Sequence, residues 1–166
     1  MKTRLSMRGV AAALVLGTAA VLSGCGTAGT AAVVDGHAIS EKDAQIAAQQ
    51  INEAFHPESP LTPRDAVSAL ITAPFILDVA NRIGHPQTAS AAMAAMPTIT
   101  APAESTIEVV RAQSAIQYLS EADKTAIITA LGKAKITVNP RYGTFVPTQA
   151  GLVATSPNWI VAPSSK

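Results

Sequence analysis

The chain has 166 residues, of which 48% are hydrophobic, and a formal net charge of +1 at pH 7. This near-neutral balance excludes the strongly basic class of nucleic-acid-binding proteins. The single cysteine excludes a disulfide framework, and few aromatic residues with abundant alanine favour closely packed helices over a β-sandwich.

The first 24 residues have the pattern of an export signal. Lys2, Arg4 and Arg8 form a basic start, and an apolar run follows over residues 9–22. The run is about 14 residues long, whereas a helix needs roughly 20 to cross a bilayer. The segment therefore predicts a cleaved signal peptide over residues 1–24.

Leu22, Ser23 and Gly24 precede Cys25, and this arrangement resembles the lipobox of bacterial lipoproteins. The resemblance implies that the mature chain begins at Cys25, whose sulfur carries the lipid. Two or three acyl chains, at ~0.8 kcal/mol per buried CH₂, anchor a protein stably. We expect a protein lipid-anchored to the extracytoplasmic face of the cell membrane, with residues 25–30 as a short lipidated tether.

Two alternatives compete with the lipid anchor. An ordinary secretory signal could be cleaved after the small residues Thr18-Ala19-Ala20, which would leave Cys25 as an idle thiol. The apolar run could also remain as a membrane span, although it is short for one.

A hairpin and a helix open the domain. Asp35-Gly36 is typical of a type I′ turn and lies between short apolar segments over residues 31–39. Ser40 with an acid three residues later predicts the start of a helix over residues 41–55. Its predicted inward stripe is Ala47, Ile51, Ala54 and Phe55.

A second helix is predicted to begin at Pro63, with Thr62 as its cap, and it continues as an apolar surface to Ile83. Pro74 removes a hydrogen-bond donor, so a kink or a split is expected there. Gly84 predicts the end of the helix.

The remaining helices are predicted over residues 89–96, 104–119 and from Ser120 to a stop at Gly132. Residues 97–102 form a loop. The helix over 104–119 is apolar on two sides, which predicts a central position. Its two sides are formed by Ile107, Val110, Ser114 and Tyr118 and by Val109, Ala112, Ile116 and Leu119.

Residues 135–139 alternate between polar and apolar side chains, as a strand does. The hairpin over 32–39 offers its partner. The prediction is a mainly α fold of four to five helices, closed by a small sheet that joins the N-terminal hairpin to this strand. Residues 146–166 are expected to form an irregular tail, with Trp159 and Ile160 as possible contacts.

Few residues suggest chemistry. His37, His56 and His85 are far apart and lack a second ligand at metal-binding spacing, and no nucleophile or phosphate-binding motif is found. No metal, cofactor or enzymatic activity is expected. Residues 139–143 predict a strand terminator with Tyr142 packed on the domain, with a partner-binding turn as the alternative.

Three apolar side chains are candidates for peptide binding. Met93 and Met96 offer adaptable contacts, and Phe75 lies on the apolar surface of the second helix. Core filling is the competing interpretation of the methionines.

Two segments carry a resemblance to a known family. Residues 32–40, Ala-Val-Val-Asp-Gly-His-Ala-Ile-Ser, lead into a helix, and residues 136–145, Ile-Thr-Val-Asn-Pro-Arg-Tyr-Gly-Thr-Phe, close the domain. Over residues 31–145 the chain resembles the N-terminal chaperone module of the SurA/PrsA family of extracytoplasmic foldases. With the lipobox, it is similar to actinobacterial lipoproteins that have a SurA N-terminal domain. No segment has room for the family's parvulin domain.

The resemblance implies a lipid-anchored, chaperone-like module that binds unfolded or exported polypeptides without prolyl isomerase activity. The alternative is an accessory or scaffolding lipoprotein that docks one dedicated cell-envelope partner, through the helical module or the Trp159 tail. Under both hypotheses the membrane contact is the N-terminal lipid, and nucleic acid is not a partner.

Overall fold

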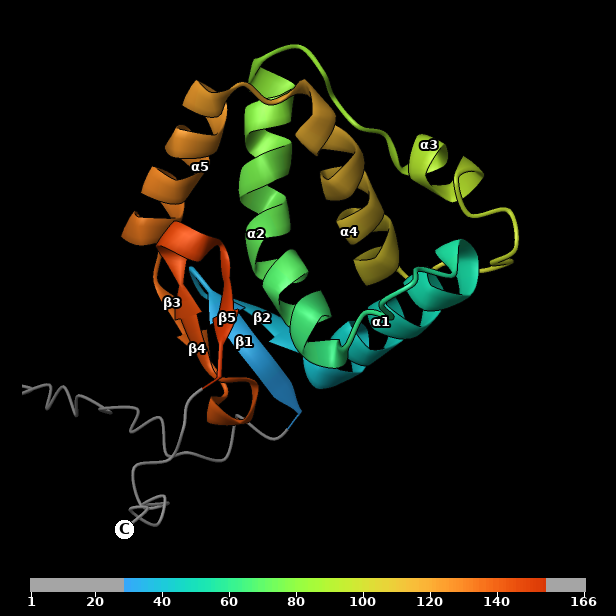
Figure 1. The fold of residues 1–166 in the computed structure, drawn as a ribbon, viewed down its shortest axis with the longest axis horizontal. Coiled ribbons are helices and arrows are strands. Elements are labelled where there is room, and N and C mark those ends of the chain that lie inside the picture. The colour runs from blue at the N-terminus through green and yellow to red at the C-terminus, as the bar shows by residue number, and fades with distance from the viewer. Residues whose placement is uncertain (1–28, 155–166) are drawn as a thin grey trace, which may run out of the picture.

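The computed structural model describes residues 29–154 (Figure 1). Within this range the fold is mainly helical, as predicted, with five α-helices and two small antiparallel sheets. In chain order the elements are β1 (Thr30–Val34), β2 (His37–Ser40), α1 (Glu41–Phe55), α2 (Pro63–Arg82), α3 (Ala89–Ala94), α4 (Glu104–Ala115), the 3₁₀ helix η1 (Ile116–Tyr118), α5 (Glu121–Lys133), β3 (Ile136–Val138), η2 (Pro140–Tyr142), β4 (Thr144–Val146), η3 (Pro147–Gln149) and β5 (Gly151–Val153).

The starts of four helices are fixed by side-chain caps, and at α3 the cap is Thr88, which accepts from the backbone N–H three residues later. Ser40, Thr62 and Ser120 each accept a hydrogen bond from the backbone N–H three residues later. At the last two starts, the carboxylates of Asp65 and Asp123 accept from the capping residue's own N–H, which completes a capping box. The predicted starts of α1, α2 and α5 are confirmed.

Helix α2 passes through Pro74 without a break, so the split that the sequence allowed does not occur. A proline inside a helix costs about 3 kcal/mol. Here α2 packs against α1, α4 and α5, and this burial offsets the cost. The helix ends as predicted: Gly84 has φ +83°, and the N–H of His85 donates to the carbonyl of Ala80 at 2.9 Å.

The ends of the domain meet in one sheet of order β2-β1-β3, which confirms the predicted pairing. Val34 lies opposite Ile136, and Ala32 lies opposite Val138. The β1-β2 turn has positive φ at both Asp35-Gly36 positions, +48° and +89°, as a type I′ turn requires. β1 is therefore the central strand.

The segment after β3 joins the end of the domain to its beginning. The Asn139 side chain donates to the carbonyl of Thr30 at 3.2 Å and to Glu41 Oε1 at 3.3 Å. Arg141 Nη1 lies 2.8 Å from both carboxylate oxygens of Glu41. Tyr142 is 8% exposed, and burial raises the pKa of its phenol. These contacts support the structural interpretation of this turn.

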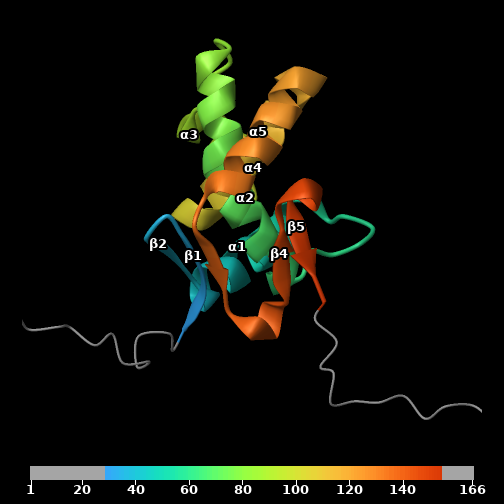
Figure 2. The same cartoon turned by 90° about the vertical axis from the view of Figure 1, so that its left-hand side faces the viewer.

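The predicted irregular tail is wrong for the part that the structure describes. β4 and β5 form a second hairpin, which packs on α2 and, through η3, on α5 (Figure 2). The N–H of Leu152 donates to Ser68 Oγ at 3.1 Å. Strands of three residues show too little alternation to be recognised in the sequence. Trp159 and Ile160 lie outside the described residues.

Four apolar side chains predicted to face the core are exposed instead. Phe55 is 46% exposed, Ile83 37%, Ile116 39% and Tyr118 45%. Each lies at the last turn of a helix or just beyond it, where the neighbouring elements no longer cover it. Periodicity gives the direction of a side chain but not the length over which a partner helix covers it.

Three helix boundaries also differ from expectation, and the first is that of α3, which ends at Ala94 rather than at Met96. α4 ends at Ala115 and tightens into η1, so the predicted helix over 104–119 is shorter. Gly132 does not end α5, because the helix continues to Lys133. A glycine that keeps helical dihedrals is compatible with a final helical turn.

The core is built from large aliphatic side chains and many alanines. α2 lies between α1, α4 and α5, so helices surround it on several sides (Figure 1). Ala44, Ala47, Ala66 and Ala115 are completely buried. Small side chains let these helices approach closely, as the alanine content predicts.

Candidate functional site

A groove lies where the β1-β2 hairpin meets α2 and α4. Its main cavity has a volume of about 680 Å³. This size lies within the range of roughly 300–1,000 Å³ that is usual for ligand pockets. The cavity is lined by Val34, Asp35, His37, Ala38, Ile39, Leu70, Pro74, Phe75, Asp78 and Glu108.

A smaller cavity of about 230 Å³ extends the main one toward the start of α4. The two share four walls, Ala38, Ile39, Leu70 and Glu108, and the smaller one adds Asp43, Glu104 and Ser105. We call the two cavities together the hairpin groove. Its lining extends from Asp35 in the β1-β2 turn to Glu104 at the start of α4, which suits an extended ligand.

The floor of the groove is apolar. Val34 and Leu70 are buried, and Ile39 and Phe75 are partly buried and pack against the core. A ligand side chain placed there would gain about 25 cal/mol for each Å² of apolar surface removed from water.

The rim of the groove is acidic. Its carboxylates are Asp35, Asp43, Asp78, Glu104 and Glu108. Three of them have partners within the domain: Asp35 accepts from the Lys135 N–H at 2.8 Å, Asp43 accepts from Ser40 Oγ at 2.6 Å, and Asp78 pairs with Arg82 at 3.2 Å.

Glu104 and Glu108 differ from the other three. Within residues 29–154, neither carboxylate forms a hydrogen bond or an ion pair through its side chain. The two lie four residues apart on α4, where like charges repel each other. Burial raises the pKa of Glu108, nearby Arg111 partly offsets the rise, and Glu104 adds to it.

β2 is an edge strand beside this groove. The sheet order is β2-β1-β3, so β2 pairs on one side only among the described strands. Figure 2 shows β2 on the outer side of β1. Its residues Ala38 and Ile39 line both cavities of the groove. An edge strand presents backbone N–H and C=O groups to which another strand can bind.

The predicted peptide-binding residues do not come together. Phe75 lines the groove. Met96 is 1% exposed and belongs to the core, so a binding role for it is wrong. Met93 is 43% exposed on α3 and lines neither cavity of the groove. Cys25 and the lipobox residues before it lie outside the described range.

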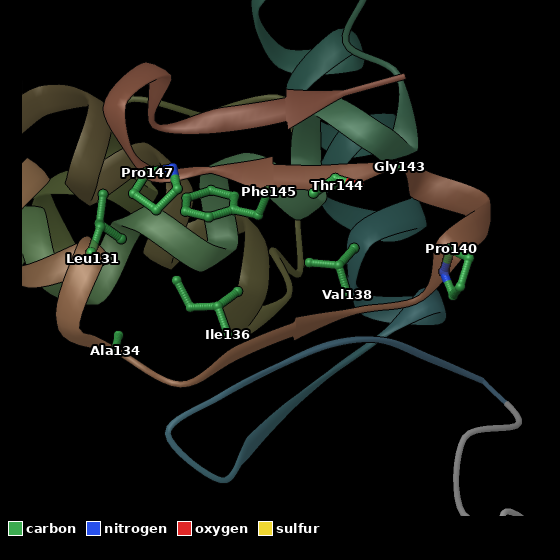
Figure 3. Close-up of a pocket in the computed structure, with 10 residues that line it drawn as sticks. Leu131, Ala134, Ile136, Val138, Pro140, Gly143, Thr144, Phe145 and Pro147 are labelled. Carbon is green, nitrogen blue, oxygen red and sulfur yellow. The ribbon is translucent and has the colours of Figure 1, made fainter. Parts of the chain in front are cut away.

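A second cavity, of about 370 Å³, separates β3 from β4 (Figure 3). Ile136 and Val138 project into it from β3, and Phe145 and Pro147 lie on the opposite wall. No ionisable side chain lines this cavity. It offers apolar contact without the charges that orient a ligand, so it is a weaker candidate than the hairpin groove.

A third cavity, of about 340 Å³, lies between the end of α1 and α4. Phe55 lines this cavity together with Leu61, Val109 and Val110. Its walls are mostly apolar, with Gln113 and Ser114 as the polar residues, and like the second cavity it lacks an ionisable group.

The histidines lie at three separate places. His37 lines the groove, His56 caps the end of α1 with φ +44°, and His85 stacks on Tyr118 with ring centroids 4.4 Å apart. Within residues 29–154, no group of three or more histidine, cysteine or acidic residues is placed to hold a metal ion. In the same range, no helix is long and apolar enough to cross a membrane.

Sequence reasoning missed the acidic rim of the groove. The i, i+4 repetition of glutamate on α4 was the available signal, since like charges at this spacing destabilise a helix.

Comparison with known proteins identifies no relative. No family model matches the chain, and neither the curated proteins nor the solved structures gave a match.

Proposed function

We propose that this protein is a lipid-anchored, extracytoplasmic, chaperone-like module that binds unfolded or exported polypeptides and has no enzymatic activity. The hairpin groove is the observation that carries the proposal, because it joins an apolar floor to a sheet edge. Unfolded chains present both apolar side chains and unpaired backbone groups. The resemblance of residues 32–40 and 136–145 to the SurA/PrsA chaperone module gives further support.

The test of binding is suppression of aggregation. Residues 26–166 contain every described element, so this soluble form keeps the groove. Near equimolar ratio and without ATP, we expect it to keep several unrelated unfolded proteins in solution. Light scattering measures the effect. Failure with every client would contradict the proposal.

A blocking variant connects the activity to the groove. Ala38 is exposed on β2 and lines both cavities, so Ala38→Trp fills the groove while leaving the core intact. Thr137→Trp is the matched control, because Thr137 is exposed on β3 and lines neither cavity. We expect only Ala38→Trp to lose suppression. Equal activity of the two variants would assign binding to another surface.

The proposed anchor is tested separately. The lipobox needs the cysteine sulfur, so Cys25→Ser should abolish labelling by a palmitate analogue and release the protein from the membrane fraction. A labelled, membrane-bound variant would show that Cys25 is not the attachment site.

A second candidate function is docking to one dedicated envelope protein. Exposed Ile83, Ile116 and Tyr118 favour it, because they lie at or just beyond the ends of α2 and α4, and the stacking of Tyr118 on His85 brings these two ends together. Crosslinking in cells distinguishes the two functions. Many unfolded clients support the chaperone, and one recurring native partner supports docking.

A further inference from the structure

The charges of the hairpin groove restrict which polypeptides it can bind. Glu104 and Glu108 have no partner of opposite charge in direct contact within residues 29–154. Arg111 lowers the pKa of Glu108 through its charge, but its only hydrogen bond within residues 29–154 runs from Nε–H to the carbonyl of Gln87 at 2.8 Å. A basic side chain on the ligand would therefore meet two carboxylates that form no direct ion pair within the domain, and of these Glu108 is only partly compensated by Arg111.

The apolar and acidic parts of the groove adjoin each other. Leu70 and Ile39 line both cavities, and Glu108 does as well. A ligand that occupies the apolar floor therefore brings its neighbouring residues to the acidic rim. A purely apolar segment would leave the rim unused, and an acidic segment would be repelled by it.

The position of β2 defines the conformation of the ligand. β2 has four residues, and its outer side faces no other described strand. A polypeptide added there gains a few backbone hydrogen bonds, and alternate side chains then point to the same face of the sheet. Contacts in the groove supply the selectivity that backbone pairing lacks.

From these three observations we propose that the hairpin groove selects extended segments carrying both apolar and basic side chains, and that such a segment pairs with the outer edge of β2 as an added strand. This inference rests on the proposed function and names its substrate class.

Three fluorescent peptides of equal length test the proposal against the soluble form. The first contains three leucines and three lysines, the second has glutamate in place of each lysine, and the third is the first with alternate backbone amides N-methylated. Fluorescence anisotropy measures the dissociation constants. We expect the lysine peptide to bind about tenfold more tightly than the other two at low salt, and about 0.5 M salt to reduce its advantage over the glutamate peptide.

Two variants assign the preference to the groove. Glu104→Gln with Glu108→Gln should remove most of the preference for lysine over glutamate. The control is Glu53→Gln with Glu58→Gln, which removes the same charge from two exposed positions that line neither cavity. The control should keep the preference, and circular dichroism checks that both variants fold.

Each result has a defined meaning. Equal binding of the lysine and glutamate peptides overturns the inference and leaves the proposed function standing, and a preference that survives the Glu104 and Glu108 changes does the same. Unchanged affinity of the N-methylated peptide refutes the added strand. If no peptide binds and no client is kept in solution, the proposed function fails together with the inference.

Discussion

Replacing Gly143 by alanine should destabilise the domain more than any other glycine-to-alanine change within residues 29–154. Gly143 is buried between η2 and β4, with φ +101° and ψ −155°. This region of backbone space is essentially restricted to glycine, and a residue with a side chain costs about 1–3 kcal/mol there. A Cβ at this position would also overlap the carbonyl oxygen of Val153.

The overlap adds a second cost. The obstructing atom belongs to the backbone of β5, so it cannot rotate away as a side chain does, and overpacking typically costs about 1–3 kcal/mol. Together the two effects reach about 2–6 kcal/mol, compared with a total stability of about 5–15 kcal/mol for a domain. At roughly 4 °C for each kcal/mol, the melting temperature should fall by about 8–24 °C.

Two other glycines separate the cost of the backbone conformation from the cost of the overlap. Gly36 has φ +89° with open space around it, so Gly36→Ala tests the backbone term alone and should cost about 1 kcal/mol. Gly132 lies in α5 with open space and no positive φ, so Gly132→Ala should stabilise by up to about 1 kcal/mol. Thermal melts followed by circular dichroism rank the three variants. If Gly143→Ala melts no lower than Gly36→Ala, the contact between Gly143 and β5 is refuted.

Three further predictions concern the sheet and two carboxylates. Ile136→Asp places a carboxylate opposite Val34 and should cost about 1–3 kcal/mol, whereas Thr137→Asp, at an exposed position of β3, should melt like the parent in the same thermal assay. Hydrogen bonds from Ser120 lower the pKa of Asp123, so the stability that they contribute is present at neutral pH and is lost as the pH falls through the lowered pKa. In an NMR titration, Ser120→Ala should raise the pKa of Asp123, and an unchanged pKa would contradict the capping box. Burial raises the pKa of Glu108, so the stability of the domain falls as the pH rises from the ordinary pKa of 4.5 through the raised pKa. In urea unfolding, Glu108→Gln should therefore be more stable than the parent at pH 7 but not at pH 4.

Local signals gave the helix starts, and the chemistry of each signal explains why. Ser40, Thr62 and Ser120 act through hydrogen bonds within their own helical turn, so the sequence alone contains the whole interaction. The Asp35-Gly36 turn is local in the same sense. The pairing of β3 with β1 was also predictable, because the chain offered only one partner with strand character.

Features that depend on distant residues were missed. Tyr118 has the period of a core residue, but its exposure depends on where the neighbouring helices end. The acidic rim forms only when the β1-β2 hairpin, α1, α2 and α4 come together, so no single stretch of sequence contains it. The β4-β5 hairpin is held by contacts with α2 and α5, including the bond from Leu152 to Ser68, across 84 positions of the chain.

The central position of β1 has a consequence for the order in which the domain folds. One neighbour, β2, follows β1 directly, but β3 arrives only with Ile136–Val138, and the bond between Lys135 and Asp35 closes a separation of 100 residues. A chain that emerges N-terminus first during synthesis can form its early helices while one side of β1 still lacks its strand. Any product truncated before Ile136 therefore keeps an open sheet edge at Ala32–Val34. Such an edge marks an unfinished copy for proteolysis or aggregation, whereas the complete chain closes it with its own final third.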